Sequence, residues 1–151
     1  METIKLNLST GVGFAYAGEF MDRGYDVVIC DVKDPVRAVE VLNKNHRGSG
    51  ANAFGIKCDV SDAKSVQKLG KFAKDKMKTI KYWINNAGVN GGRRALREVP
   101  VEQVDLVVKV NLLGTLLCTK VAMDIMAEQE GVTGHIFNTV GSGVKGGKKD
   151  I

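Results

Sequence analysis

The stretch that decides the fold is KYWINNAG, residues 81–88, in which a short apolar run ends in two asparagines and two small residues. The aromatic and β-branched content of the run predicts a buried strand. Consecutive strand residues point to opposite faces, so Asn85 and Asn86 cannot both face solvent if the sheet is covered on both sides. A buried amide without a partner is costly. We therefore expect a specific partner for each asparagine, and room for a ligand beside Ala87 and Gly88.

The rest of the chain alternates compact apolar runs with longer amphipathic ones. This alternation, at intervals of roughly thirty residues, predicts right-handed βαβ units and a Rossmann-type, doubly wound parallel sheet. We expect an α/β fold with about five strands in a single domain, residues 1–151. The expected strands are 1–8, 25–32, 53–60, 81–88 and 135–140, and the expected helices are 13–24, 38–45, one capped by Ser61, and 101 to about 129.

The first of these strands is the weak one. Residues 1–8, METIKLNL, alternate polar and apolar side chains. A central parallel strand is normally apolar on both faces. We therefore expect an edge-like or poorly fitting first strand, or a start that does not belong to the domain.

Composition narrows the class of protein. With 151 residues, 44% of them hydrophobic, the chain is expected to be one soluble globular domain. We find no apolar run that we expect to cross a bilayer, and no signal or transit segment at the start. The three cysteines lie in apolar runs without metal-ligand spacing, so we interpret them as buried thiols in a reducing compartment.

The net charge of +5 favours acidic partners, and residues 64–81 carry much of it. Seven lysines alternate there with apolar residues at helical spacing, which predicts a surface helix with a solvated lysine face. Nucleic-acid binding is not expected, because arginines and aromatic residues are absent from that face. His46 and His135 have no cluster of partners nearby in sequence, so a catalytic or metal role is the minority interpretation.

Ligands of a doubly wound sheet bind beyond the carboxyl ends of its strands. The turn NLSTGVG, residues 7–13, places Gly11 and Gly13 at a helix start, where free N–H groups and close backbone approach favour a pyrophosphate. Asp31 ends the next strand, where a carboxylate accepts hydrogen bonds from ribose hydroxyls and repels a 2′-phosphate. The plainer alternatives are a simple turn and a solvated acid. Asp59, after the third strand, is either an adenine-side contact or a turn residue leading to Ser61.

Together these residues carry a resemblance. The GxG turn, Asp31, Asp59, the NNAG motif of residues 85–88 and Asn111 in KVNLLGT occur in an order and spacing that resemble the short-chain dehydrogenase/reductase family. The resemblance covers nearly the whole chain from Asn7 onward. Within the family, several stretches look most like the plant and algal chlorophyll(ide) b reductases.

The resemblance implies a role for each matching residue. It implies an NAD(P)-dependent oxidoreductase that reduces the 7-formyl group of chlorophyll b, in the chloroplast, or in the cytoplasm if the subgroup is different. NADPH is the donor expected from the subgroup, whereas Asp31 favours NAD(H). Pairing with a second chain is expected through the wide apolar helix around Asn111, the family's catalytic asparagine. The implied cofactor-binding residues are Ser9, Thr10, Gly11, Gly13, Asp31, Asp59, Val60, Asn86, Ala87 and Gly88.

Three departures from the family pattern affect this expectation. The first glycine of the family's phosphate turn, TGxxxGxG, falls on Asn7. The family's substrate-orienting serine falls on Gly141, and Ser142, our second catalytic candidate, is one residue late. No YxxxK motif follows before Ile151, so we expect a C-terminally incomplete domain that is inactive as given. The alternative is a non-catalytic nucleotide-binding or partner-binding module that pairs with a full-length relative.

Overall fold

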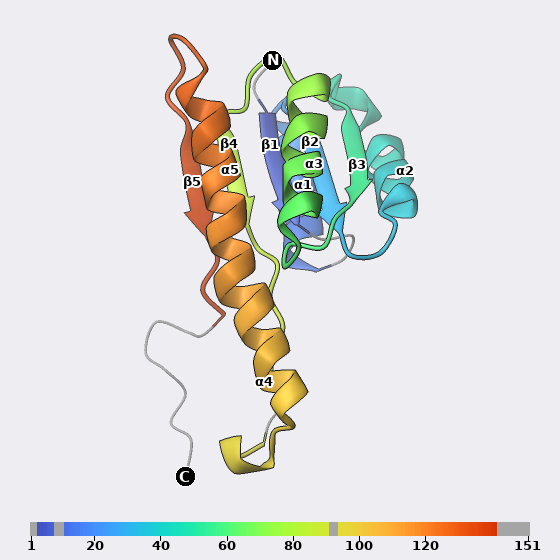
Figure 1. Ribbon diagram of the computed structural model, residues 1–151. Helices are drawn as coiled ribbons and strands as arrows, with labels where there is room; N and C mark the ends of the chain where they lie inside the picture. Colours follow the sequence, from blue (N-terminus) through green and yellow to red (C-terminus); the bar gives the residue numbers. More distant parts are fainter. Residues whose placement is uncertain (1–2, 8–10, 91–93, 142–151) are drawn as a thin grey trace.

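The computed structural model describes residues 3–7, 11–90 and 94–141, the first of these segments by its backbone alone. A five-stranded sheet with the strand order β3-β2-β1-β4-β5 forms the centre of the molecule (Figure 1). Every pairing between neighbouring strands is parallel, as the sequence predicts. The strands are β1 Thr3–Asn7, β2 Asp26–Asp31, β3 Ala53–Lys57, β4 Tyr82–Asn85 and β5 His135–Asn138.

Helices cover both faces of this sheet. Helices α1 (Val12–Asp22) and α2 (Val36–Asn45) bury side chains in one apolar cluster, and α3 (Ala63–Lys76) and α5 (Thr115–Ala127) do so in the other. Strand β2 joins the two clusters, because its fully buried residues alternate between them. Val28 and Cys30 belong to the α3–α5 cluster, and Val27 and Ile29 belong to the α1–α2 cluster. Short 3₁₀ turns lie at Arg47–Ser49 and Leu96–Glu98.

Strand β1 occupies the middle of the sheet, so two of the three alternatives for the first strand, an edge-like strand and a start outside the domain, were wrong. Its ladder with β2 runs over five residue pairs, from Thr3–Asp26 to Asn7–Cys30. Its ladder with β4 has only two pairs, Ile4–Tyr82 and Lys5–Trp83. The topology explains the position, because right-handed crossovers that run outward in both directions leave the first strand in the centre. Asn7 closes the strand rather than belonging to the turn that follows.

The start of α3 corrects a second expectation, since Asp62 and not Ser61 caps this helix. The Asp62 carboxylate accepts hydrogen bonds from the backbone N–H groups of Lys64 at 3.1 Å and Ser65 at 3.2 Å. A carboxylate offers two oxygens to two otherwise unpaired N–H groups and also complements the helix dipole. The Ser61 hydroxyl donates instead to Asp59 Oδ1 at 2.7 Å.

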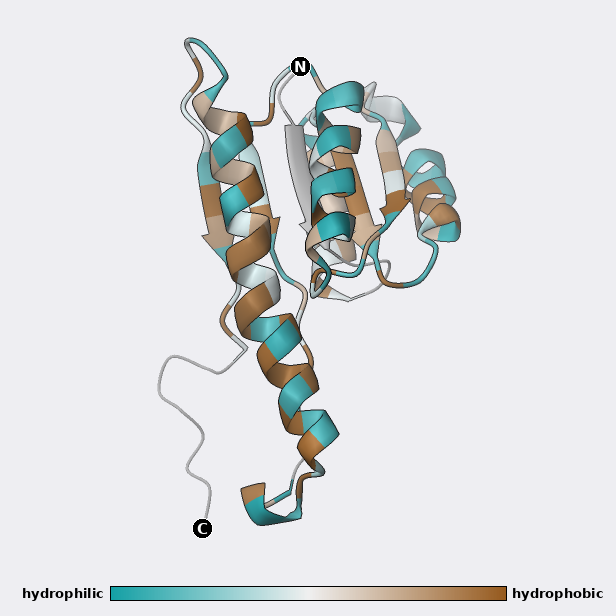
Figure 2. Cartoon of the chain, viewed as in Figure 1, coloured by the Kyte–Doolittle hydropathy of each residue, from teal (hydrophilic) through white to brown (hydrophobic). Residues whose placement is uncertain are grey.

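One long helical run extends past the carboxyl edge of the sheet (Figure 1). It comprises α4 (Val101–Val107), a π-helical segment η3 (Val108–Gly114) and α5, and ends close to the predicted Gln129. Figure 2 shows how much of this run is hydrophobic, and many of its apolar side chains are exposed. The run Val101–Ala127 is long and apolar enough to span a membrane by length and composition alone, with 17% of its most apolar window buried. The expectation that no run has this property was therefore wrong, because the charged residues of the run are few and are spread among apolar ones.

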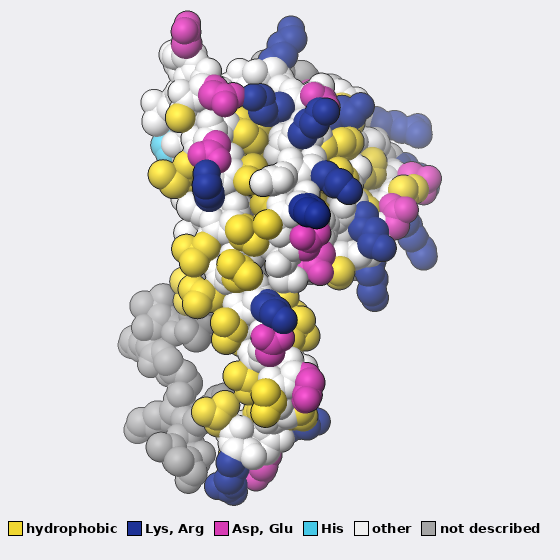
Figure 3. Space-filling model, viewed as in Figure 1, with side chains coloured by type: hydrophobic (Ala, Val, Ile, Leu, Met, Phe, Trp, Pro, Cys, Tyr) yellow, Lys and Arg dark blue, Asp and Glu magenta, His cyan; other side chains and the backbone are white. Residues whose placement is uncertain are grey.

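The helix predicted over residues 64–81 is confirmed up to Lys76, where α3 ends, and residues 77–81 lie outside it. Val66, Leu69 and Ala73 are buried on one side of this helix, whereas its lysines are exposed. Figure 3 shows lysine and arginine side chains gathered over this part of the molecule, beside the apolar surface of the long helix.

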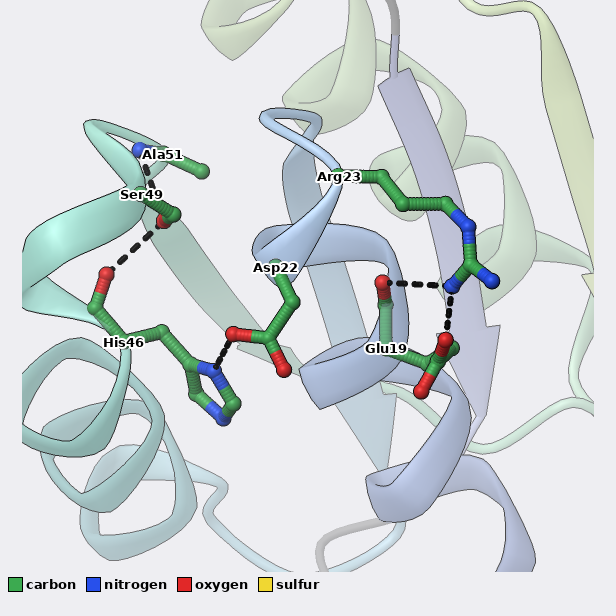
Figure 4. Close-up of polar contacts among 6 residues, drawn as sticks. All are labelled: Glu19, Asp22, Arg23, His46, Ser49 and Ala51. Atoms are coloured by element: carbon green, nitrogen blue, oxygen red, sulfur yellow. Dashed lines mark hydrogen bonds and ion pairs between the residues drawn. The ribbon is translucent and has the colours of Figure 1, made fainter.

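The end of α1 is tied to the segment after α2 by His46 (Figure 4). The Nδ1 atom of His46 lies 2.5 Å from Asp22 Oδ1, and an added Cβ at Gly18 would lie 3.0 Å from His46 Nε2. The Ser49 hydroxyl donates to the His46 carbonyl at 2.8 Å and accepts from Ala51 N. On the same helix, Arg23 pairs with Glu19. His46 thus connects the end of α1 to the segment after α2.

Candidate functional site

The carboxyl ends of β2, β3 and β4 surround a cavity of about 320 Å³. Five of the residues predicted to bind the cofactor line it, so the structure brings together side chains that lie up to 57 positions apart in sequence, from Asp31 to Gly88. Most of the other lining residues are apolar. The lining consists of Asp31, Val32, Cys58, Asp59, Val60, Ser61, Ala87, Gly88, Val89, Leu106 and Val110.

Two acids contribute to this cavity in different ways. Asp31, at the end of β2, is partly exposed, and its Oδ1 accepts a hydrogen bond from Lys33 N at 2.9 Å. Asp59 Oδ1 accepts from both the backbone N–H of Ser61 at 2.9 Å and its hydroxyl at 2.7 Å. Asp59 therefore acts as the turn residue that the sequence offered as an alternative, while it also lines the cavity. Asp31 lines the cavity at the carboxyl end of its strand.

The first asparagine of the NNAG motif is the centre of a buried polar network. Asn85 is 8% exposed, and its Oδ1 accepts a hydrogen bond from the indole N–H of Trp83 at 2.9 Å. Its Nδ2 donates to Thr119 Oγ1 at 3.0 Å and to Asn138 Oδ1 at 2.8 Å. The expected partners for Asn85 are thus present, and they join β4 to α5 and β5. Asn86 is half-buried and does not line the cavity.

Asn111 lies in the π-helical segment and holds the chain that leaves β4. Its Oδ1 accepts a hydrogen bond from Val89 N at 2.8 Å, and its Nδ2 donates to Val89 O at 2.8 Å. Such π-helical turns frequently occur at functional sites. Asn111 thus holds both backbone polar groups of Val89 in place. The segment that it holds directly follows Ala87 and Gly88 in the cavity wall.

Gly114 lets this helix approach the cavity from the other side. An added Cβ at Gly114 would lie 2.8 Å from Val60 Cγ2 and 3.2 Å from the Val60 carbonyl oxygen. Only a residue without a side chain allows this approach. Val60 is therefore held between the helix and the cavity, with 6% of its surface exposed.

The glycine turn lies at the start of α1, after the carboxyl end of β1. Gly11 precedes the helix with a φ of 79°, a conformation that favours glycine, and Gly13 is buried in the first turn. Neither glycine lines the cavity. Ser9, Thr10 and Ser142 lie outside the described residues, while Gly141, in the register of the family's serine, is exposed. Among the described residues no group of three or more His, Cys, Asp or Glu side chains could hold a metal ion.

Comparison with known proteins accounts for this arrangement. The family model for short chain dehydrogenase matches residues 7–148. The chain belongs to this family. A probable chlorophyll(ide) b reductase of Arabidopsis thaliana, described as chloroplastic, is 37% identical over 90% of the chain. A second chloroplastic chlorophyll(ide) b reductase of the same plant is 39% identical, also over 90% of the chain. The chain spans only 30% and 39% of the length of these two short-chain dehydrogenase relatives.

Solved structures show the same fold. A short-chain dehydrogenase/reductase from Mycobacterium marinum matches with a TM-score of 0.80 at 23% identity, over 91% of this chain and 53% of that one. An alcohol dehydrogenase from Thermococcus sibiricus, in complex with 5-hydroxy-NADP, matches with a TM-score of 0.75 at 26% identity, over 83% of this chain and 53% of that one. The predicted α/β Rossmann-type fold and the predicted family are thus confirmed, and the family is one of oxidoreductases that use a nicotinamide dinucleotide.

Sequence reasoning missed part of the polar network. Trp83 and Thr119 received no role, and Asn138 was noticed only as part of a strand. A signal was present, because Asn85 and Asn138 each end an apolar run that was predicted to be a strand. In the sheet these two residues are direct partners across β4 and β5.

Proposed function

We propose that the chain binds NAD(P)H in the cavity at the carboxyl ends of β2, β3 and β4, as part of a carbonyl-reducing oxidoreductase. The observation that carries the proposal is the convergence of Asp31, Asp59, Val60, Ala87 and Gly88 on one cavity of about 320 Å³. The apolar walls suit an adenine ring, and the carboxylate of Asp31 on the rim suits a ribose diol. The residues present therefore fit the adenosine half of such a cofactor.

The diphosphate would be held at the start of α1. Gly11 and Gly13 stand at the first turn of that helix, where backbone N–H groups suit an anion, and Ser9 and Thr10 directly precede Gly11 in sequence. Asn7 takes the place of the family's first glycine in this turn and closes β1. We expect weaker diphosphate binding than in relatives that have glycine at that position.

The substrate that we propose is the 7-formyl group of chlorophyll(ide) b, with reduction to a hydroxymethyl group in the chloroplast. The support comes from the two chloroplastic relatives, each aligned over 90% of this chain. When bound, the nicotinamide supplies a hydride, and a proton donor must complete the reduction. Asn111 would orient the backbone at Val89 beside the reacting groups, and Ser142 is the hydroxyl closest in sequence to the family's serine position.

The proton donor itself is not identifiable in these 151 residues. None of the three tyrosines begins a YxxxK motif, since the residues four positions after Tyr16, Tyr25 and Tyr82 are Phe, Ile and Asn. We propose that the 151-residue chain binds the cofactor without efficient carbonyl reduction. The expectation of a C-terminally incomplete domain rests on the same observation.

A second candidate function is that of a partner-binding module, favoured by the long helix. Four of its side chains repeat at intervals of four residues and are exposed, which leaves a stripe that a second chain could cover. The exposed fractions are 37% for Val104, 50% for Val108, 59% for Leu112 and 58% for Leu116. Such a module would pair through the helix around Asn111 with a second copy or with a full-length relative. Sedimentation velocity at several concentrations distinguishes a paired chain from a single one.

Calorimetric titration with NADH and NADPH tests the cofactor proposal. Gly88→Leu places a large side chain in the cavity and is expected to abolish binding of both cofactors. Gly48→Leu is the matched control, because an added Cβ at Gly48 has nothing within 4 Å. Failure of the folded wild-type chain to bind either cofactor, or unchanged binding by the Gly88 variant, would contradict the proposal.

A further inference from the structure

The net charge of the chain is concentrated on one helix and its flanks. Seven of the 22 Lys and Arg residues, but only two of the 17 Asp and Glu residues, lie in residues 61–81. The rest of the chain therefore carries fifteen residues of each sign and no net charge. The proposed cofactor site does not account for this imbalance, because none of these seven lysines lines the cavity.

Three of the lysines form a stripe that has no internal partner. Lys64, Lys68 and Lys71 are spaced at i, i+4 and i+7 on α3, so they share one side of the helix. All three are exposed, and among the described residues none of them has an ion-pair or ring partner. We call these three residues the lysine stripe. Asp75, about one turn beyond Lys71, limits the stripe at its C-terminal end.

Three of the other four lysines of the same region have partners, whereas Lys78, beyond the end of α3, is exposed and has no ion-pair or ring partner among the described residues. Lys74 Nζ lies 2.6 Å from Glu128 Oε2 on α5. Lys76 Nζ lies 5.6 Å from the centre of the Phe54 ring, and Lys81 Nζ lies 5.6 Å from that of Tyr82. The difference matters because a lysine with a partner can stabilise the folded chain. The three lysines of the stripe only repel one another, which destabilises it.

We propose that the lysine stripe of α3 binds an anionic lipid surface. The stripe lies on the exposed side of α3, which covers the same face of the sheet as α5. Figure 3 shows lysine and arginine side chains gathered in this region. Lysines on flexible stems suit the diffuse charge of lipid headgroups, at about 1 kcal/mol per lysine near the surface. RNA is a poorer fit, since the stripe has neither the arginines nor the aromatic side chains that read phosphates and stack on bases. A second copy is also a poorer fit, because two lysine stripes repel one another.

This surface goes beyond the proposed reaction and does not depend on it. The stripe lies on α3, whereas the exposed apolar side chains of the long helix lie on α4, η3 and α5. Binding is expected to be weak and dependent on ionic strength, because exposed charges are screened within about 10 Å at 0.1 M salt.

The test is co-sedimentation of the whole chain with vesicles of phosphatidylcholine, alone or mixed with an equal amount of phosphatidylglycerol. The variant K64Q/K68Q/K71Q removes the stripe and keeps good helix formers. The matched control R37Q/K44Q/R47Q removes the same charge from exposed positions on and just after α2, across the sheet from α3. Circular dichroism verifies that both variants fold.

We expect the wild type and the control to bind the anionic vesicles at low salt and not the neutral ones. The stripe variant is expected to bind roughly 100-fold more weakly, at about fivefold for each lysine. Equal loss in both variants would overturn the proposal, because total charge would then explain the binding. Binding that persists at high salt would point to the apolar long helix instead, and binding to single-stranded RNA without binding to anionic vesicles would assign the stripe to nucleic acid.

Discussion

The side-chain amide of Asn111 is paired with both backbone polar groups of a single residue, Val89. It accepts from the N–H and donates to the carbonyl, each at 2.8 Å. A carboxamide has one acceptor oxygen and two donor hydrogens, so this reciprocal pair needs Asn or Gln. The arrangement makes the π-helical segment a clamp on the chain that leaves β4, next to the proposed cofactor site.

Replacement of this amide should loosen the clamp. Asn111→Leu keeps a similar volume and removes both hydrogen bonds, at a cost of about 1–2 kcal/mol in unfolding free energy. Amide hydrogen exchange at Val89 should accelerate, and cofactor affinity should fall severalfold. Lys109→Ala is the control, since it breaks only an exposed pair with Asp105 on the same helix. Equal exchange rates at Val89 in both variants would show that Asn111 does not hold this segment.

The Asn85 network should depend on the single tryptophan of the chain. Trp83→Phe keeps a buried aromatic ring but leaves the Asn85 oxygen, at an 8% exposed residue, without its indole donor. We expect a loss of about 1–3 kcal/mol in urea unfolding followed by circular dichroism. Tyr82→Phe, one residue earlier, is the control and should change stability by less than about 0.5 kcal/mol. A Trp83 variant as stable as the Tyr82 variant would contradict the role given to the network.

Much of the fold followed from local pattern. Strands β2 to β5 were predicted because compact apolar runs of this length rarely form anything else between amphipathic segments. The position of β1 could not be predicted from residues 1–8, because the crossover connections to the other strands decide which strand lies in the middle of the sheet. Ser61 and Asp62 are adjacent, so the sequence did not show which of them caps α3. The cap is the side chain that reaches two backbone N–H groups at once, and this is Asp62.

Part of the candidate site could also be predicted from the sequence. Asp31, Asp59 and Ala87 follow strands, and parallel strands end at one edge, so their meeting in a cavity was foreseeable. The partners of Asn85 were not, because Thr119 is 34 positions away on a helix whose rotation the sequence does not fix. The close approach of Gly114 to Val60 could not be predicted either, because it depends on two elements that are distant in sequence.

That close approach leads to a prediction for Gly114→Ala. The added methyl group would meet Val60 at 2.8 Å, and overpacking of this kind costs about 1–3 kcal/mol. Alanine gains about 1 kcal/mol over glycine in helix propensity, so the net loss in unfolding free energy should be small. The larger effect should be weaker cofactor binding, measured by calorimetry, because Val60 lines the cavity. Gly48→Ala serves as control. Similar cofactor affinities for the two variants would show that the close approach of Gly114 to Val60 does not affect cofactor binding.

The rim acid predicts the choice of cofactor. Asp31 should favour NADH over NADPH by about tenfold or more, since its carboxylate would face the 2′-phosphate of the latter. Asp31→Ser should remove most of this preference, because the repulsion is lost while a hydroxyl still reaches the ribose. Asp34→Ser, which changes the same charge three residues later, should preserve it. Calorimetric titration of all three chains measures the ratio, and equal affinity of the wild type for both cofactors would refute the role of Asp31.

The last prediction concerns catalysis. The 151-residue chain should show no measurable reduction of chlorophyll b, even with excess cofactor. Loss of a positioned acid typically costs about two to four orders of magnitude in rate, and loss of substrate positioning adds to this. The tyrosines offer no replacement near Asn111. Tyr82 stacks on His135 and packs near Phe20, in the apolar cluster on the α1 face of the sheet. Asn85, on the same strand, points to the opposite face of the sheet and contacts α5.

Pigment analysis after incubation with the cofactor measures the product directly, and a catalytically active short-chain reductase is the positive control. Cofactor binding without turnover is the expected result, since the residues proposed to bind the adenosine line one cavity and no YxxxK motif occurs in these 151 residues. Turnover at the rate of the positive control would show that a residue within this chain supplies the proton. Ser142→Ala would then be the first variant to assay, because Ser142 is the hydroxyl closest in sequence to the family's serine position.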